Sequence, residues 1–495
     1  MPHAVAAAPR CAPRCGVVDL GSNSVRMVVF EGRGRNPSAI FNEKAVLRLG
    51  RGLQTTGRLN EDAIGPALRV MTRYGAIARA MGADPFHIVA TAAVRDATNG
   101  AAFVADLQGR LPGVPIQVLT GEEEAAYSTA GVLCGIPGAN GIVADIGGGS
   151  LEVVRVGGGL RRADSLPLGV IRLSDRAEGD LPRARAIADA DLQGVAWLHE
   201  GAGLDLYLVG GAFRALARIH MVQAGYPLNI VHHYTVGRDA ARELAVAVTS
   251  APRRTLERMP GAPRRRVEDL PFAATVLRRL LRQTGAARVV FSANGLREGW
   301  YMRQVPASER DRDPVLAASS EIAGRYGRDP AMPAALLAWT APLFPAETPA
   351  ERRLRDAACG LSDIGAHDHP EYRAEQSFLR VLRQPGVGMD HPTRAFLALT
   401  VALRYEAEPD APFLLPARTL LDAAKWSRAE VLGTALRLAY TLSAGTTALL
   451  AGANLRVADG RVGLRLAEGS GVFAGDGIQR RLERLAAAMG LAAAS

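Results

Sequence analysis

The sequence has few cysteines and no long apolar run. Its four cysteines in 495 residues form no CxxC pair, which excludes a disulfide framework and favours a reduced, cytoplasmic protein. No stretch of about 18 apolar residues occurs, so we expect no membrane partner.

Lysine is also nearly absent, because it occurs only at Lys44 and Lys425. Arginine therefore supplies almost all of the positive charge, and the formal net charge is +10. Such an excess suits a polyanionic partner, such as nucleic acid, a membrane surface or a condensed phosphate chain. The densest arginine runs lie at residues 253–254, 264–266 and 278–282, although runs of this kind are more often solvated helix faces than binding sites.

The length and the periodicity predict three domains. A chain of 495 residues exceeds what one hydrophobic core usually supports. Strand and helix patterns alternate up to about residue 305, which indicates an α/β structure, and the remainder is mostly helical, with an Asp-Gly hairpin at 454–467. We expect domains at 15–140, 141–305 and 306–495.

One pattern occurs twice in the first two domains. Residues 16–30 and 142–156 each read as an apolar run, a glycine-rich loop and a second apolar run, which predicts a hairpin. The copies align at an offset of 126 residues, with three pairs of like residues: Asp19 with Asp145, Gly21 with Gly147, and Ser24 with Ser150. The repeat predicts two homologous lobes.

Each glycine-rich loop is a candidate phosphate site. Consecutive backbone N–H groups in a tight turn can surround an anion, and we expect glycine there for positive φ angles and close backbone approach. One such loop alone would be an ordinary turn, but two at equivalent places favour phosphate binding. The predicted phosphate-binding residues of the loops are Asn23, Ser24, Gly147, Gly148, Gly149 and Ser150.

Carboxylates next to these loops predict a metal ion. Asp19 and Asp145 end the strands that lead into the loops, and Glu152 lies on the strand that returns from the second. They would repel a phosphate group unless a cation lay between, and Mg²⁺ binds to one or two carboxylates together with phosphate oxygens. We therefore predict Asp19, Asp145 and Glu152 as ligands of Mg²⁺; capping of the turns is the alternative for the two aspartates.

Six segments in order resemble the exopolyphosphatase and guanosine pentaphosphate phosphohydrolase family. The resemblance covers about residues 15 to 305 and is carried by residues 18–24, 91–95, 121–125, 145–152, 209–211 and 295–299. It implies duplicated actin-like lobes with a ribonuclease H-like fold, in the superfamily that also contains actin, sugar kinases and heat-shock chaperones.

The resemblance also implies roles for side chains. Glu124 matches the family's general base, and a carboxylate within reach of an attacking water can accept its proton; the run of three glutamates leaves Glu123 as the alternative. Arg95 matches a phosphate-binding arginine, whose guanidinium can contact two oxygens at once. Arg26 and Arg297 are weaker candidates, because either could instead join the lobes by a salt bridge.

The third domain resembles the helical domain of the longer exopolyphosphatases, which is related to metal-dependent HD phosphohydrolases. Leu361-Ser362-Asp363 stands where an active HD domain would read His-Asp, and the nearby histidines, His367, His369 and His391, do not rebuild the spacing. We expect a degenerate HD-like domain that serves homodimerisation and guides a polyanion.

The predicted function is Mg²⁺-dependent release of terminal orthophosphate from inorganic polyphosphate, with no nucleic-acid partner. One alternative is hydrolysis of guanosine pentaphosphate (pppGpp), with pppGpp or ppGpp as a ligand of the same residues. Others are an ATP-dependent kinase of the same fold and a non-catalytic alarmone or polyphosphate binder. The helical domain and the basic charge favour polyphosphate, because a long chain needs an extended charged track.

Overall fold

A computed structural model describes residues 12–159, 162–385, 388–467 and 475–494. The chain divides into two compact units, Met1–Asp311 and Arg312–Ser495. Within the described ranges, no helix has both the length and the apolar character to cross a membrane. The protein is α/β in unit 1 and mainly helical in unit 2.

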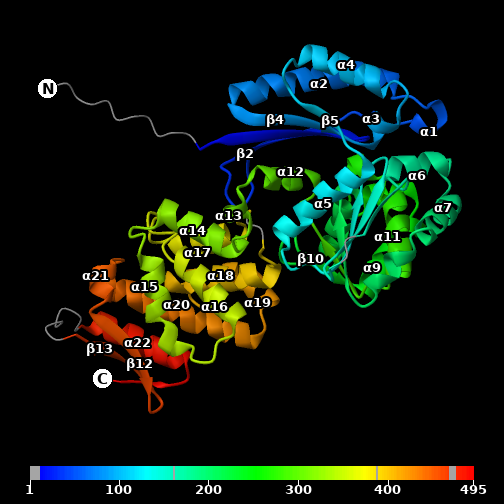
Figure 1. Ribbon diagram of the computed structural model, residues 1–495. Helices are drawn as coiled ribbons and strands as arrows, with labels where there is room; N and C mark the ends of the chain where they lie inside the picture. The colour runs from blue at the N-terminus through cyan, green and yellow to red at the C-terminus, as the bar shows by residue number, and fades with distance from the viewer. Residues whose placement is uncertain (1–11, 160–161, 386–387, 468–474, 495) are drawn as a thin grey trace, which may run out of the picture. The chain divides into compact units, whose positions relative to one another are not determined.

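Unit 1 begins with a lobe built on one five-stranded sheet, which we call lobe I (Figure 1). The strand order is β3-β2-β1-β4-β5, and helices α2 (Glu61–Ala80) and α4 (Gly100–Arg110) cover one face. The strands are β1 (Arg14–Leu20), β2 (Ser24–Glu31), β3 (Ser38–Val46), β4 (Ala83–Ala90) and β5 (Ile116–Val118). The β1 to β3 pairs are antiparallel, whereas β1, β4 and β5 run parallel.

Lobe II repeats this topology. Its sheet has the order β8-β7-β6-β9-β11-β10, with antiparallel pairs from β6 to β8 and parallel pairs between β6, β9 and β11. The strands are β6 (Gly141–Ile146), β7 (Leu151–Val156), β8 (Ala163–Leu166), β9 (Asp205–Val209), β10 (Tyr234–Gly237) and β11 (Arg288–Phe291). The two hairpins of the sequence repeat are β1-β2 and β6-β7, the central strands of equivalent sheets.

The remaining helices of unit 1 lie between these strands, except for the last two, which follow β11. They are α1 (Leu53–Thr56), α3 (Ala92–Asp96), α5 (Gly121–Gly135), α6 (Val170–Arg176), α7 (Leu181–Gln193), α8 (Gly211–Gln223), α9 (Arg238–Ser250), α10 (Arg253–Arg258), α11 (Leu270–Thr284), α12 (Leu296–Gln304) and α13 (Ala307–Arg310). Helix α7 ends at Gln193, Gly194 caps it, and a short 3-10 helix follows over Ala196–Gly201.

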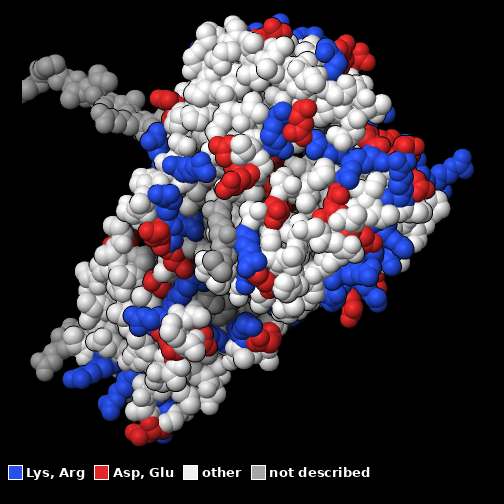
Figure 2. Space-filling view, turned by 45° about the vertical axis from the view of Figure 1, so that its right-hand side comes forward, with Lys and Arg blue, Asp and Glu red and all other residues white. Residues whose placement is uncertain are grey.

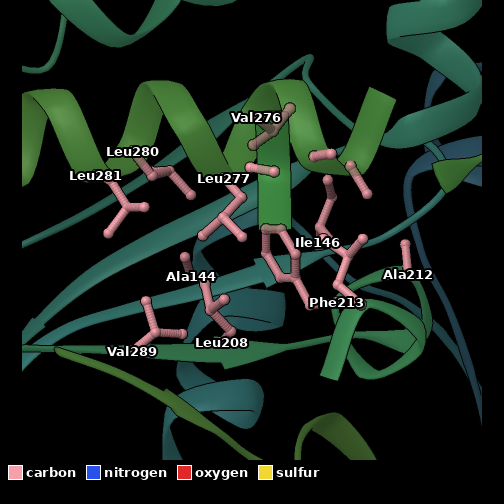
Figure 3. Close-up of a cluster of buried hydrophobic side chains, with 14 of the residues drawn as sticks. Ala144, Ile146, Leu208, Ala212, Phe213, Val276, Leu277, Leu280, Leu281 and Val289 are labelled. Atoms are coloured by element: carbon pink, nitrogen blue, oxygen red, sulfur yellow. The ribbon is translucent and has the colours of Figure 1, made fainter. Parts of the chain in front are cut away.

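Helix α11 closes the core of lobe II over its sheet. Figure 3 shows Val276, Leu277 and Leu281 of this helix pointing toward the strands. They meet strand residues such as Leu208 and Val289, which are also buried. Each fully buried leucine contributes about 1.5–3 kcal/mol. This packing holds β9 and its neighbour β6, whose end carries the second glycine-rich loop.

Helices α5 and α12 approach so closely that their backbones touch. A Cβ atom on Gly131 would lie 2.0 Å from the carbonyl oxygen of Gly295, and one on Gly299 would lie 1.8 Å from that of Tyr127. Only glycine permits such contact at both places. The two helices run antiparallel, with the beginning of α12 next to the second half of α5.

Unit 2 contains nine helices among its described residues and a small sheet of order β12-β13-β14. The α-helices are α14 (Pro314–Tyr326), α15 (Met332–Trp339), α16 (Pro349–Leu361), α17 (Arg373–Leu382), α18 (His391–Arg404), α19 (Leu415–Leu420), α20 (Ala423–Ser443), α21 (Thr447–Leu450) and α22 (Asp476–Ala488). The strands are β12 (Ala453–Ala458), β13 (Arg461–Leu466) and β14 (Ala492–Ala493). The predicted Asp-Gly hairpin is confirmed, with φ of 53° at Asp459 and 71° at Gly460.

The Asp363 carboxylate of unit 2 forms ion pairs with two arginines. Its carboxylate lies 2.8 Å from Nη2 of Arg328 and 3.5 Å from Nη2 of Arg404. The Arg404 guanidinium is itself buried between the rings of Tyr405 and Tyr440, at 4.0 and 3.9 Å from their centroids. The Asp363 carboxylate therefore neutralises buried positive charge.

We expect Asp363→Ala to lower the free energy of unfolding of unit 2 by about 3–5 kcal/mol, because Arg404 would remain buried without a counter-ion. Urea unfolding of the full chain measures this. The control is Glu408→Ala, which removes an exposed ion pair with Arg484 and should cost less than about 1 kcal/mol. Equal losses in the two variants would show that the buried cluster needs no carboxylate.

Candidate active site

The two glycine-rich loops close in the same way and face one pocket. The Gly21 N–H donates to the Ser24 carbonyl at 3.2 Å, and the Gly147 N–H donates to the Ser150 carbonyl at 2.9 Å. Between the lobes they line a cavity of about 130 Å³. Its wall includes all the predicted loop residues, Asn23, Ser24, Gly147, Gly148, Gly149 and Ser150.

The reason for glycine in these loops differs from the sequence expectation. None of Gly21, Gly147, Gly148 and Gly149 has a left-handed φ, so the expected positive φ angles are wrong. Close packing requires glycine instead, because a Cβ atom on Gly148 would lie 3.0 Å from Cβ of Ser22, and one on Gly149 2.8 Å from its Oγ. The loops of the two lobes therefore pack directly against each other through Ser22, which the sequence analysis missed.

Gly169 supports the second loop from behind. It precedes helix α6, and a Cβ atom there would lie 2.4 Å from the Ser150 backbone nitrogen and 2.5 Å from the carbonyl carbons of Gly148 and Gly149. Its backbone is in an ordinary extended conformation, with φ −59° and ψ 148°. The position therefore needs glycine for space alone.

Two predicted metal ligands, Asp19 and Asp145, lie in the pocket wall. Asp19 Oδ2 is 3.0 Å from Nη1 of Arg297, so Arg297 joins lobe I to α12. Asp145 accepts a hydrogen bond from the Ser128 hydroxyl. Loss of hydration raises the pKa of both carboxyl groups. The positive charge of Arg297 opposes the rise at both.

Glu124 lies in the pocket wall at the beginning of α5 and is 8% exposed. Burial raises the pKa of its carboxyl group well above the ordinary value, and the negative charge of Glu152 raises it further. Arg95 opposes this shift from 3.3 Å. A carboxylate with a raised pKa is a stronger proton acceptor, as a general base requires.

The neighbouring glutamate has a different task. Glu123 accepts a hydrogen bond from the Thr120 N–H at 2.9 Å, and the Thr120 hydroxyl accepts one from the Glu123 N–H at 3.1 Å. This reciprocal pair is a capping box. The structure therefore places Glu124 in the pocket and Glu123 at the helix cap.

Arg95 contacts the predicted base and does not line the pocket. Besides Glu124, its guanidinium contacts the Leu119 carbonyl at 2.9 Å and Asp96 at 3.1 Å. These contacts orient the Glu124 carboxylate. The phosphate-binding role expected for Arg95 stays a prediction.

Glu152 also lies behind the pocket wall. It is 1% exposed and accepts a hydrogen bond from the Ser165 hydroxyl at 3.0 Å. Burial and the charge of Asp145 raise its pKa. Throughout the described ranges, no three His, Cys, Asp or Glu side chains are grouped so that they could hold a metal ion. Of the predicted metal ligands only the two aspartates line the pocket, and the role of Glu152 as a third ligand stays a prediction.

Five cationic side chains complete the pocket wall: Arg26, Lys44, Arg214, Arg266 and Arg297. The sequence analysis missed Lys44 and Arg214 and treated Arg266 only as part of a basic run. Arg214 did have a signal, because it follows β9 at the spacing at which Arg95 follows β4. Lys44 had none, since β3 has no apolar alternation and was not predicted.

One arginine of each basic run forms an ion pair. Arg253 lies 2.9 Å from Glu257, and Arg279 lies 3.0 Å from Asp189. On the face that Figure 2 shows, basic and acidic side chains are interspersed. From the middle run, Arg266 reaches the pocket.

Comparisons with known proteins match both units. A profile of the Ppx/GppA phosphatase family matches residues 28–308, and a profile described as exopolyphosphatase, C-terminal, matches residues 315–494. Exopolyphosphatase 2 of Mycobacterium tuberculosis is 33% identical over 188 residues, which span 36% of this chain and 59% of that protein. Exopolyphosphatase 1 of Mycobacterium bovis is 28% identical over 320 residues, 62% of this chain and 92% of that protein.

Two solved structures share the fold of unit 1. An exopolyphosphatase from Cytophaga hutchinsonii has a TM-score of 0.54 at 22% identity and covers 59% of this chain and 99% of its own. The PPX-GPPA enzyme of Aquifex aeolicus has a TM-score of 0.51 at 24% identity, with the same coverage. Together with the two matched profiles, these observations show that the chain belongs to the Ppx/GppA phosphatase family.

Proposed function

We propose that this protein hydrolyses the terminal phosphoanhydride bond of inorganic polyphosphate and releases orthophosphate. The observation that carries the proposal is the position of Glu124, whose carboxylate with a raised pKa faces the same pocket as both glycine-rich loops. The loops supply backbone and hydroxyl donors for a terminal phosphoryl group. A water molecule next to Glu124 would then attack in line.

In this reaction the water oxygen bonds to the terminal phosphorus while the bridging P–O bond breaks. Glu124 accepts the proton of the water, and Arg95 holds the Glu124 carboxylate in place. The electron pair of the broken bond stays on the shortened chain. Arg297 and the loop donors stabilise the charge on the transferred group.

The donor set of the pocket fits Mg²⁺. Asp19 and Asp145 line it together, and both have pKa values raised by lost hydration, so a cation would stabilise their charged forms. Mg²⁺ typically uses one or two carboxylates and completes its octahedron with water and phosphate oxygens. When bound, it would neutralise phosphate charge beside these aspartates.

Polyphosphate fits the pocket better than guanosine pentaphosphate. The cavity of about 130 Å³ is smaller than the roughly 300–1,000 Å³ usual for pockets that enclose a drug-sized ligand. No aromatic side chain is among the described residues that line it, so nothing there would stack on a guanine base. A thin anionic chain needs neither a larger cavity nor an aromatic ring to stack on.

The test is orthophosphate release from long-chain polyphosphate. We expect turnover with Mg²⁺ and a loss of at least 100-fold when EDTA removes it, restored by added Mg²⁺. The same assay with pppGpp decides between the two substrates by their kcat/KM values. Higher kcat/KM for pppGpp would reverse the assignment, and phosphate transfer from ATP to a small molecule would indicate a kinase.

Further properties stay predictions. We propose that the equivalent sheets of unit 1 are actin-like lobes, as their shared strand order supports. We also propose that unit 2 is a degenerate HD-like domain, because Asp363 pairs with arginines. Homodimerisation and a cytoplasmic location are untested.

A further inference from the structure

The two lobes carry equivalent rows of side chains with opposite charge. In lobe I, Asp19, Arg26 and Lys44 lie directly opposite one another across β1, β2 and β3. In lobe II, the same positions of β6, β7 and β8 hold Asp145, Glu152 and Ser165. The duplication has therefore placed two cations in lobe I where lobe II has a carboxylate and a hydroxyl.

A second equivalent pair shows the same contrast. Arg95 and Arg214 each stand five residues beyond the end of a matching strand, β4 and β9. Arg95 lies 3.3 Å from Glu124. Arg214 instead lies near Arg297, Arg26 and Asp145. Burial and the two positive charges lower its pKa to about 10, and the charge of Asp145 opposes this fall.

Most other charges in the pocket wall are paired. Arg297 lies 3.0 Å from Asp19, and Arg266 lies 3.4 Å from Asp269. Among the residues that the structure describes, no ion pair within 4.0 Å involves Arg26, Lys44 or Arg214. These three are the cations of the pocket wall that lie outside such ion pairs.

Their proximity is unfavourable without an anion. Like charges directly opposite each other on neighbouring strands are destabilising, as Arg26 and Lys44 are. Partial burial and the charges of Arg266, Arg214, Arg26 and Arg297 lower the pKa of Lys44 to about 8, although part of the side chain is exposed. As far as the chain is described, the pocket wall thus holds three cations outside any ion pair within 4.0 Å, together with the carboxylates of Glu124 and Asp145.

We infer that Arg26, Lys44 and Arg214 form a subsite for the second and third phosphate groups of a linear chain. The terminal phosphate then lies toward Glu124, and the rest of the chain leaves over β3, the edge strand of lobe I. This inference rests on the proposed function and adds the direction in which the phosphate chain lies in the pocket. Lys44 and Arg214 become determinants of specificity for chains of three or more phosphates.

The test compares Lys44→Gln and Arg214→Gln with the native chain on pyrophosphate, tripolyphosphate and long-chain polyphosphate. A charge-assisted hydrogen bond contributes enough to change affinity by about tenfold to hundredfold. We expect KM for tripolyphosphate to rise by that factor, with a smaller change in kcat. The preference for tripolyphosphate over pyrophosphate should fall by at least tenfold.

Two matched controls lie outside the pocket. Lys425→Gln removes the other lysine, which pairs with Asp422 at the surface, and Arg185→Gln removes an exposed arginine. Both should keep KM within about twofold of the native value. Unchanged KM in Lys44→Gln and Arg214→Gln, with an active native enzyme, would overturn the subsite.

The pH profile distinguishes charge from shape. Since Lys44 loses its charge as the pH rises above about 8, kcat/KM of the native chain should fall there. Lys44→Arg stays charged and should remove this fall, whereas an identical profile would contradict the role of the ammonium group. Calorimetric binding of tripolyphosphate tests the same variants without turnover, so failure of the proposed hydrolysis and failure of the subsite remain distinguishable.

Discussion

Glu124→Gln is expected to lower kcat for orthophosphate release by about 10²–10⁴-fold, because glutamine cannot accept the proton of the attacking water. Glutamine has the same shape and can still accept a hydrogen bond from Arg95, 3.3 Å away. The substitution also removes a buried negative charge that the negative charge of Glu152 repels. Steady-state phosphate release and the affinity for tripolyphosphate measure the two sides of this change.

The informative comparison is Glu123→Gln. Its side-chain oxygen can still accept from the Thr120 N–H and preserve the capping box. We expect Glu123→Gln to keep kcat within about twofold, and Glu124→Gln to bind tripolyphosphate at least as tightly as the native chain. If Glu123→Gln were the inactive variant, the assignment of the base would move by one residue.

Gly169→Ala is expected to lower kcat/KM by about 10²-fold, although it adds only one methyl group at a residue outside the loop itself. The new Cβ would lie 2.4 Å from the Ser150 nitrogen, so the second glycine-rich loop or the beginning of α6 must shift. A displacement near 1 Å in a catalytic site can cost about 10²-fold. The overpacking should also cost about 1–3 kcal/mol of stability, which thermal unfolding measures.

Gly237→Ala is a closely matched control. Gly237 also precedes a helix, α9, with φ −61° and ψ 153°, and a Cβ atom there meets nothing within 4 Å. Both substitutions therefore change backbone entropy alike, and only Gly169 has a steric conflict. Native activity in both variants would mean that the loop tolerates displacement.

Local signals in the sequence predicted much of the site. The two hairpins were predicted because a glycine-rich turn between apolar runs needs no distant partner. The 126-residue repeat predicted two equivalent lobes, and the strand orders of the two sheets agree with it. The resemblance supplied Glu124 and Arg95, which do lie in contact.

Contacts between distant parts of the chain were not predictable in this way. Asp19 of the first hairpin pairs with Arg297 of α12, which is 278 residues away along the chain. Glu152 follows the second glycine-rich loop closely along the chain, which suggested a metal ligand. Its partner across the neighbouring strand is Ser165, and the two hydrogen-bond behind the pocket wall. Neither fact has a trace in local periodicity.

The sequence by itself determined that two glycine hairpins with aspartates recur in equivalent lobes, because turn chemistry and apolar alternation are local properties. Only the tertiary structure decided which charges face each other in the pocket. Strand register sets Lys44 opposite Arg26, and backbone contact requires glycine at position 169. Both depend on how separate elements pack, since a side chain's partners across a sheet or between lobes are chosen by register and close approach rather than by its neighbours along the chain.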